Sequence, residues 1–104
     1  MVDLATRLGP VTLRSPLIGA CGTVGSVVDF AAVGALEAYG AAVAKSVSGD
    51  PWPGRPTPRM APTAVGMLNG IGIQNPGVDA WVADIGPQLR ALDVPVWGSA
   101  VGAT

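Results

Sequence analysis

Three short apolar runs constrain the fold of this chain more than any other feature, because apolar and polar side chains do not alternate along them. They occupy residues 17–20, 41–44 and 94–98. Strands that are apolar on both faces are typical of parallel sheets covered by helices. Apolar residues at helical spacing fill residues 27–40 and 75–92, ahead of the second and third runs. The order predicts an α/β fold without a domain boundary in residues 1–104, and both barrels and open sheets fit it.

The segments between these runs carry their own turn and cap signals. Gly9 and Pro10 separate two short alternating stretches, which predicts a hairpin with its turn at that pair. Gly40 is predicted to cap the first helix and Asn75 the second, while Gly86 and Pro87 should kink or split the second helix. Five prolines between residues 49 and 62 exclude a helix or a central strand there and predict a long ordered loop.

Composition excludes several classes of function. The formal net charge of -1 gives no electrostatic footprint for nucleic acid or an anionic membrane. Histidine is absent and cysteine occurs once, so we expect neither imidazole catalysis nor a metal site. The first residues do not resemble a signal peptide, and no apolar stretch approaches the ~20 residues of a membrane span, so we expect a cytoplasmic chain. Hydrophobic residues make up 49% and charged residues only 12%, as in the interior of a larger molecule.

Lys45 is the first candidate site residue. It is the only lysine and follows directly on the apolar run 41–44. A lysine at a strand end often extends into water with no further role. The carboxyl end of a parallel strand is, however, where ligands bind in both barrels and doubly wound sheets. We therefore expect Lys45 to act as a fixed positive charge against a carboxylate or a developing anion rather than as a nucleophile.

A glycine-spaced segment at residues 67–77 is the second candidate. Gly70 and Gly72 remove side chains where the backbone approaches a ligand or takes a positive φ, and Asn69, Gln74 and Asn75 supply paired donors and acceptors. Asn69 has apolar neighbours in Leu68 and Ile71 and no obvious capping role, so we expect it to face a ligand. With Lys45 it predicts a pocket for a planar, anionic ligand that carries an amide.

Four stretches, taken together, resemble class 1 dihydroorotate dehydrogenases, flavoenzymes of pyrimidine synthesis built on a TIM (β/α)8 barrel. They are residues 16–22 (PLIGACG), 44–46 (AKS), 54–59 (GRPTPR) and 66–77 (GMLNGIGIQNPG), with the strand that ends at Ser99 as a fifth match. The resemblance covers nearly all of the chain. It implies a partial barrel: an amino-terminal hairpin and the first three or so parallel strands with their helices, in one FMN-binding domain over residues 1–104.

The resemblance also implies roles for individual residues. Ala20, Cys21 and Gly22 would lie along the isoalloxazine of FMN, and Lys45 and Ser46 would contact flavin and substrate together. Ser99 would lie beside the flavin, where the family usually has asparagine. Asn69, Gly70, Ile71, Gly72 and Ile73 would hold the ring and carboxylate of dihydroorotate or orotate. The lone Cys21 has no histidine to activate it, so we expect contact with the cofactor rather than catalysis.

The implied reaction is the oxidation of dihydroorotate to orotate, an oxidoreductase step on a CH–CH bond. A base takes a proton from C5 and flavin N5 takes a hydride from C6. Electrons would pass to fumarate or, through a partner subunit with FAD and an iron-sulfur cluster, to NAD; a homodimer is the other expected assembly. The family's cysteine or serine base and its phosphate-binding segments match nothing in this sequence. We therefore expect the amino-terminal part of the enzyme, inactive alone.

Two alternatives remain open at this point. The chain could be a non-catalytic remnant or one interaction half of a split barrel. It could also belong to a related flavin barrel, such as the pyrimidine-binding domain of dihydropyrimidine dehydrogenase, whose substrate lacks the carboxylate that a lysine would meet.

Overall fold

The computed structural model describes residues 2–102, and a parallel three-stranded sheet lies at its centre. The strands follow one another across the sheet as β3 (Ile18–Gly19), β4 (Ala41–Val43) and β7 (Val96–Trp97). Ile18 pairs with Ala41, and Ala42 pairs with Val96. The prediction of an α/β fold in which the three apolar runs form parallel strands is confirmed.

An antiparallel hairpin precedes the sheet. It consists of β1 (Thr6–Leu8) and β2 (Val11–Leu13), with Leu8 opposite Val11. The turn contains Gly9, whose φ of 58° is readily adopted only by glycine, and this confirms the predicted position of the turn. Only Leu13 of this hairpin is buried.

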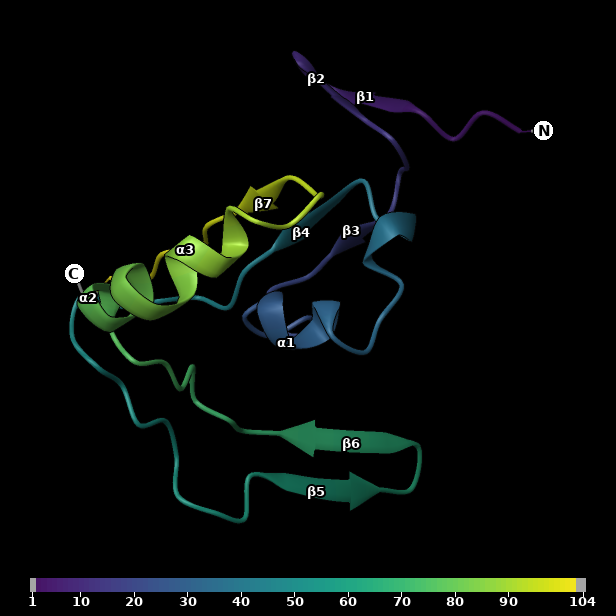
Figure 1. The fold of residues 1–104 in the computed structure, drawn as a ribbon. Coiled ribbons are helices and arrows are strands. Elements are labelled where there is room, and N and C mark those ends of the chain that lie inside the picture. The colour runs from purple at the N-terminus through teal and green to yellow at the C-terminus, as the bar shows by residue number, and fades with distance from the viewer. Residues whose placement is uncertain (1, 103–104) are drawn as a thin grey trace.

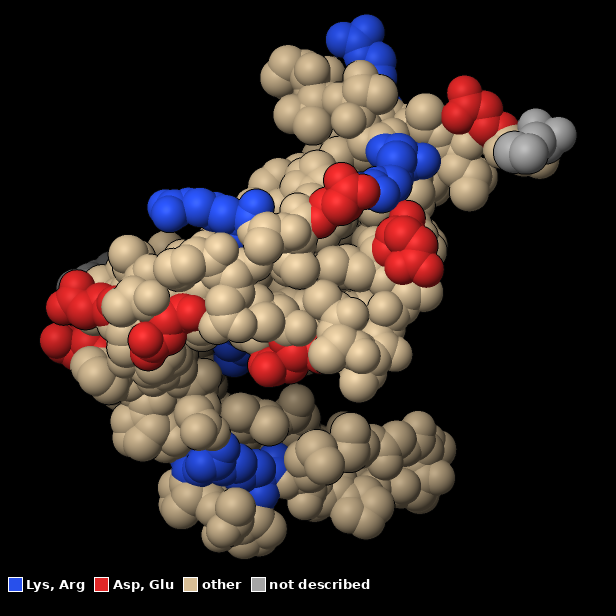
Figure 2. All heavy atoms as spheres, viewed as in Figure 1, with Lys and Arg blue, Asp and Glu red and all other residues tan. Residues whose placement is uncertain are grey.

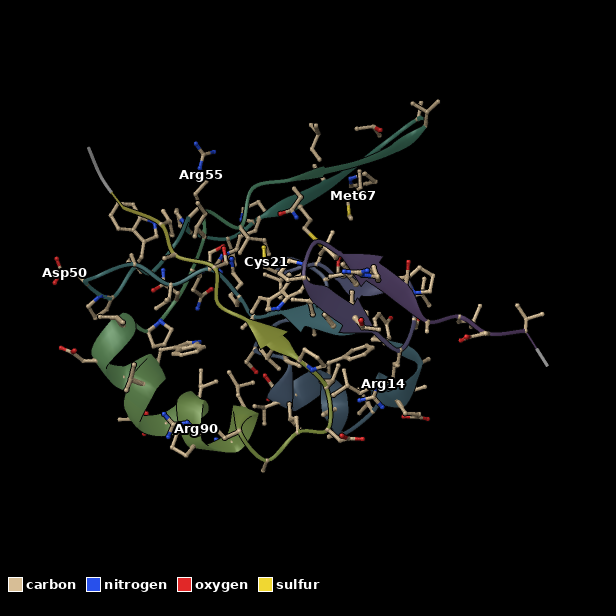
Figure 3. All side chains as sticks on the ribbon, turned by 90° about the horizontal axis from the view of Figure 1, so that it is seen from above. Arg14, Cys21, Asp50, Arg55, Met67 and Arg90 are labelled. Carbon is tan, nitrogen blue, oxygen red and sulfur yellow. The ribbon has the colours of Figure 1, made fainter. Side chains whose placement is uncertain are left out.

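The helical segments lie on one side of the sheet, as Figures 1 and 3 show. They are α1 (Val28–Ala31), the 3-10 helix η1 (Leu36–Ala38), α2 (Val78–Ala80), the π-helical turn η2 (Trp81–Ile85) and α3 (Gly86–Leu89). None of the helices in residues 2–102 is long and apolar enough to cross a membrane. The core between these segments and the sheet is formed by Val24, Val27, Leu36, Ala42, Ala44, Leu89 and Val94.

The prediction of one helix over residues 27–40 is wrong. The chain forms only the single turn of α1 and then η1, and Gly34 lies between them against the ring of Phe30, where a Cβ would come within 2.5 Å of that ring. Gly40 does not cap a helix. Its N–H donates to the carbonyl of Leu17 at 2.9 Å, and a side chain there would collide with the carbonyl of Ser15. Glycine is needed at this position because the residue before β4 packs directly against the backbone that leads into β3.

The second helical segment is interrupted at the predicted place. Before Gly86 and Pro87 the α-helical pattern of α2 widens into η2, where the N–H of Gly86 donates to the carbonyl of Trp81. A π-turn spaces its hydrogen bonds five residues apart and is a recognised way of fitting a helix-breaking residue. Regular α geometry then resumes in α3.

A second hairpin, β5 (Met60–Thr63) with β6 (Gly66–Asn69), lies on the opposite side of the sheet from the helices (Figure 3). The prolines predict a loop over residues 49–62, and that prediction is wrong for residues 60–62, which belong to β5. Pro62 fits because each strand of a two-stranded ribbon has one side without pairing partners. Every residue of both strands is exposed, and most of the hairpin surface seen in Figure 2 carries no charge.

Candidate functional site

Three small polar side chains meet at the carboxyl ends of the parallel strands. Cys21 follows β3, Ser46 follows β4 and Ser99 follows β7. The Oγ atoms of Ser46 and Ser99 are 2.9 Å apart, and Ser46 Oγ lies 3.8 Å from Cys21 Sγ. Parallel strands bring their carboxyl ends to one edge, so residues 25 and 53 positions apart come together. We call Cys21, Ser46 and Ser99 the rim cluster.

The neighbours of Cys21 leave the rim open. Ala20 and Gly22 are both exposed, and a Cβ added at Gly22 would meet no atom within 4 Å. The carbonyl of Ala20 accepts the N–H groups of Thr23 and Val24 at 2.8 and 3.0 Å, which folds this loop into a tight turn. The rim cluster therefore borders a surface made of small side chains, and Figure 3 shows Cys21 near the middle of the molecule rather than at its periphery.

Lys45 lies beside the rim cluster in the sequence and is held by its backbone. Its N–H donates to the carbonyl of Gly25 at 2.8 Å, which ties the end of β4 to the loop that follows β3. The residue is half-buried. In residues 2–102 the one ion pair joins Arg14 and Asp93, 3.4 Å apart, so Lys45 has no carboxylate partner in this part of the chain. An ammonium group without a counter-ion can serve an anionic ligand.

Lys45 opens onto a hollow of about 610 Å³ between two loops. We call it the Lys45 hollow. Among residues 2–102, no acidic side chain lines it. One wall comes from the chain after β4 and the other from the segment that joins β6 to α2. The lining residues are Lys45, Pro51, Trp52, Pro53, Ile71, Gln74, Asn75 and Pro76.

Of the residues predicted to bind substrate, Lys45 and Ile71 line this hollow, whereas Asn69 does not. Asn69 ends β6, and its Oδ1 accepts the N–H of Ile71 at 3.0 Å. This bond gives its side chain a local structural role that the sequence analysis did not assign. Ile73 borders a second hollow, of about 530 Å³, which shares Trp52 and Asn75 with the first. The proposed convergence of Lys45 and Asn69 on one ligand stays a prediction.

Gly72 serves a close approach between two chain segments. Its φ is +77°, and an added Cβ would lie 3.0 Å from the N of Arg55 and 3.3 Å from the Cα of Gly54. Nearby, Arg55 N donates to the Ile71 carbonyl at 3.1 Å and Gly70 N to the Arg59 carbonyl at 2.7 Å. Gly72 therefore lets residues 54–59 pack against residues 70–72, and the partner of the close approach is the protein backbone, whereas a Cβ at Gly70 would make only ordinary contacts at 3.8 Å or more.

Asn75 has a role that the sequence analysis missed. It does not cap a helix, because α2 begins at Val78 with Gly77 as the residue before it and without a side-chain cap. Its side chain instead is 8% exposed and bonds to both loops around the Lys45 hollow. The signal available in the sequence was Ser48, a small hydroxyl residue in the loop after the lysine strand, but no spacing rule connects it to residue 75.

Comparison with known proteins agrees with the resemblance. The family model described as "Dihydroorotate dehydrogenase" matches residues 3–104. The protein named dihydroorotate dehydrogenase B (NAD(+)), catalytic subunit, of Desulforudis audaxviator (strain MP104C) is 43% identical over 103 residues, which are 99% of this chain and 34% of that protein. The protein of the same name from Geobacter sulfurreducens (strain ATCC 51573 / DSM 12127 / PCA) is 45% identical over 94 residues, 90% of this chain and 31% of its own length.

The chain thus spans about a third of the length of the curated relatives that it matches. The agreement extends over the strands, the rim cluster and both walls of the Lys45 hollow, all of which lie within the matched residues. The family predicted from the four sequence stretches is confirmed: this chain belongs to the dihydroorotate dehydrogenase family.

Proposed function

We propose that this chain forms the amino-terminal part of a flavin-dependent dihydroorotate dehydrogenase, which oxidises dihydroorotate to orotate in pyrimidine biosynthesis. The observation that carries the proposal is the meeting of Cys21, Ser46 and Ser99 at one sheet edge, next to a lysine without a carboxylate partner in residues 2–102. The three parallel strands β3, β4 and β7 would be the first strands of a TIM (β/α)8 barrel, which needs eight. Such barrels carry their active sites at the carboxyl ends of the strands.

The rim cluster fits FMN as cofactor. The small side chains of Ala20, Cys21 and Gly22 leave open space in which a flat ring can lie against the backbone. Ser46 and Ser99 supply two hydroxyl groups, each of which can donate and accept a hydrogen bond. When bound, FMN would supply the acceptor for the hydride that leaves the substrate.

Lys45 would bind and orient the substrate. Dihydroorotate and orotate are six-membered rings that carry a carboxylate, and the Lys45 hollow presents one ammonium group together with the amide of Gln74 and no acidic side chain from residues 2–102. The ammonium group would hold the substrate carboxylate as a point charge and keep the ring next to the rim cluster. Ile71 supplies an apolar wall. The proton acceptor of the reaction would come from outside these residues.

The electron acceptor and the partners are part of the same proposal. The relatives carry the words catalytic subunit and NAD(+) in their names. This favours transfer of electrons to NAD through a separate electron-transfer subunit, for which we propose FAD and an iron-sulfur cluster, over transfer to fumarate. A homodimer of the catalytic chain is compatible with this arrangement.

The test restores the missing part of the barrel. The 104-residue chain is co-expressed with the remaining two thirds of the Desulforudis audaxviator relative, and the purified assembly is called the complemented protein. We expect it to retain FMN and to oxidise dihydroorotate but not dihydrouracil, which lacks the carboxylate. A complemented protein that binds FMN and oxidises only dihydrouracil would contradict the proposed substrate, and one without FMN would contradict the proposed cofactor site.

A further inference from the structure

Asn75 forms the densest group of hydrogen bonds around the Lys45 hollow. Its Oδ1 accepts the N–H of Ser48 at 3.1 Å and the N–H of Gly77 at 3.0 Å. Its Nδ2 donates to Ser48 Oγ and to the carbonyl of Ile73, each at 2.9 Å. The hydroxyl of Ser48 can then donate to the carbonyl of Asp50 at 2.7 Å. Both lone-pair directions of Oδ1 and both hydrogens of Nδ2 are satisfied in a nearly buried side chain.

The backbone of the same residue continues the connection. Asn75 N donates to the carbonyl of Trp52 and Trp52 N donates to the carbonyl of Asn75, both at 2.9 Å. Val78 N donates to the carbonyl of Gly49 at 3.2 Å. Gly77 has a φ of +83°, and a Cβ there would lie 2.8 Å from Pro51 N, so the two segments pack without space between them.

These bonds join the two walls of one hollow. Ser48, Pro51 and Trp52 belong to the segment that follows β4. Ile73 and Gly77 belong to the opposite segment, which contains Gln74. The rim cluster takes part in none of them, because its hydrogen bonds run between Ser46, Ser99 and Cys21. The side chain of Asn75 thus joins the two walls through its bonds with Ser48, beside the backbone bonds between Asn75 and Trp52, and the hydrogen bonds of the rim cluster are separate from these.

We propose that Asn75 is a positioning residue, which sets the distance between Lys45 and the Ile71–Gln74 wall and thereby the affinity for the anionic pyrimidine. The inference rests on the function proposed above. It assigns Asn75 no contact with the substrate. Loss of the side chain leaves the N–H groups of Ser48 and Gly77 without their partner, and such buried groups draw in water or move apart. The expected consequence is a wider hollow with unchanged flavin binding.

The first experiment measures two affinities in the complemented protein. Asn75→Ala should weaken orotate binding, followed by the change in flavin absorbance, by about thirtyfold, the effect of one to two buried hydrogen bonds, while the FMN content stays that of the parent. Ser48→Ala removes only the Oγ partner and should weaken binding by about threefold. Gln88→Ala removes an exposed amide that bonds the Asp84 carbonyl in its own helical segment, and it serves as the matched control with parental affinity.

A second readout does not require a ligand. Lys45 is the only lysine of the chain, so its acetylation by acetic anhydride can be followed by mass spectrometry, with the α-amino group as internal reference. Asn75→Ala should raise the acetylation rate of Lys45 severalfold, and Gln88→Ala should not. This comparison reports on the hollow even if the parent binds neither FMN nor orotate, a result that would overturn the proposed function alone.

Three results would overturn the positioning role. Asn75→Ala could bind orotate as the parent does, or Lys45 could be acetylated at the parental rate. FMN and orotate could also be lost together in both Asn75→Ala and Ser48→Ala, which would make the two residues necessary for folding and not for the shape of the hollow.

Discussion

At the scale of single residues, Lys45 and Ser46 follow one another at the end of β4, yet their side chains meet different neighbours. Ser46 joins the rim cluster through Ser99, whereas Lys45 borders the hollow with Ile71 and Gln74. These two neighbouring residues thus contact different parts of the structure. Substitutions at these two residues should therefore separate effects on the substrate from effects on the cofactor.

Lys45→Met should affect the substrate alone. Methionine keeps the apolar stem and removes the charge, so the KM of the complemented protein for dihydroorotate should rise by about 10- to 100-fold, the effect of one charge-assisted hydrogen bond. Bound FMN, measured by its absorbance per mole of protein, should stay unchanged. Lys45→Arg keeps the charge and should recover part of the affinity. An unaltered KM in Lys45→Met would exclude the lysine from the substrate site.

Ser46→Ala should affect the cofactor. The substitution removes the hydroxyl that bonds Ser99 at 2.9 Å, and with it one hydrogen-bonding group offered to the flavin. The dissociation constant for FMN should rise by about fivefold, since one neutral hydrogen bond contributes about 1 kcal/mol. Titration of the flavin-free complemented protein with FMN measures it, with Ser48→Ala as a serine control outside the rim cluster. Equal FMN affinities of parent and Ser46→Ala would argue against the rim cluster as the flavin site.

At the scale of secondary structure elements, the sequence predicted those whose signals are local. The Gly9-Pro10 turn and the three apolar strands were correct because a turn glycine and an uninterrupted apolar run determine backbone and burial by themselves. The prediction for residues 27–40 was wrong because their apolar spacing fits one helix, while the chain forms two short helical turns with Gly34, a poor helix former, between them. Hairpin β5–β6 was missed because the prolines, which exclude a helix or a central strand, were interpreted as a loop, although a strand of a two-stranded ribbon accepts them.

Gly40→Ala tests the close approach that joins β4 to the chain before β3. A Cβ at this position collides with the carbonyl of Ser15, a backbone atom that cannot turn aside as a side chain can. We expect the free energy of unfolding of the complemented protein to fall by about 1–3 kcal/mol, measured from the urea midpoint. Gly49→Ala places the same methyl group where no atom lies within 4 Å, and it should leave the midpoint within about 0.5 kcal/mol of the parent. Similar losses in both variants would contradict a steric requirement for glycine at residue 40.

Part of the candidate site, like part of the secondary structure, could be predicted from the sequence. Lys45, Cys21, Ser46 and Ser99 were found because each follows an apolar strand, and parallel strands bring such residues to one edge. One wall of the Lys45 hollow, with Ile71, Gln74 and Asn75, comes from the predicted segment 67–77, whereas the wall that contains Trp52 was not predicted because its segment has no periodic pattern. Their positions depend on hydrogen bonds between residues about 25 positions apart, such as Ser48 to Asn75, and no local rule gives such pairs.

At the scale of the whole molecule, much apolar surface is exposed. β3 and β7 each lack a neighbour on one edge within residues 2–102, and both strands of the β5–β6 hairpin are exposed throughout. Val65 is fully exposed, and Met67 and Leu68 are 60% and 67% exposed. Two-stranded ribbons and unpaired strand edges need a covering partner for independent stability. A longer barrel of the kind proposed would supply one.

The isolated 104-residue chain should therefore neither retain FMN nor oxidise dihydroorotate. Open edges and bare apolar faces predict aggregation, which light scattering of the refolded chain measures, and addition of excess FMN should leave no bound flavin after gel filtration. The complemented protein is the control and should elute as one soluble species. A monodisperse isolated chain with stoichiometric flavin would contradict the need for a covering partner.

The most direct test of the central claim, that the rim cluster and Lys45 form one flavin and dihydroorotate site, is an anaerobic titration of the complemented protein. Dihydroorotate is added without an electron acceptor, and the flavin absorbance is recorded. We predict that the absorbance bleaches in the parent, and that Lys45→Met with the same FMN content needs much more dihydroorotate for the same bleaching. A parent protein that holds FMN but keeps its full absorbance at saturating dihydroorotate would contradict the claim.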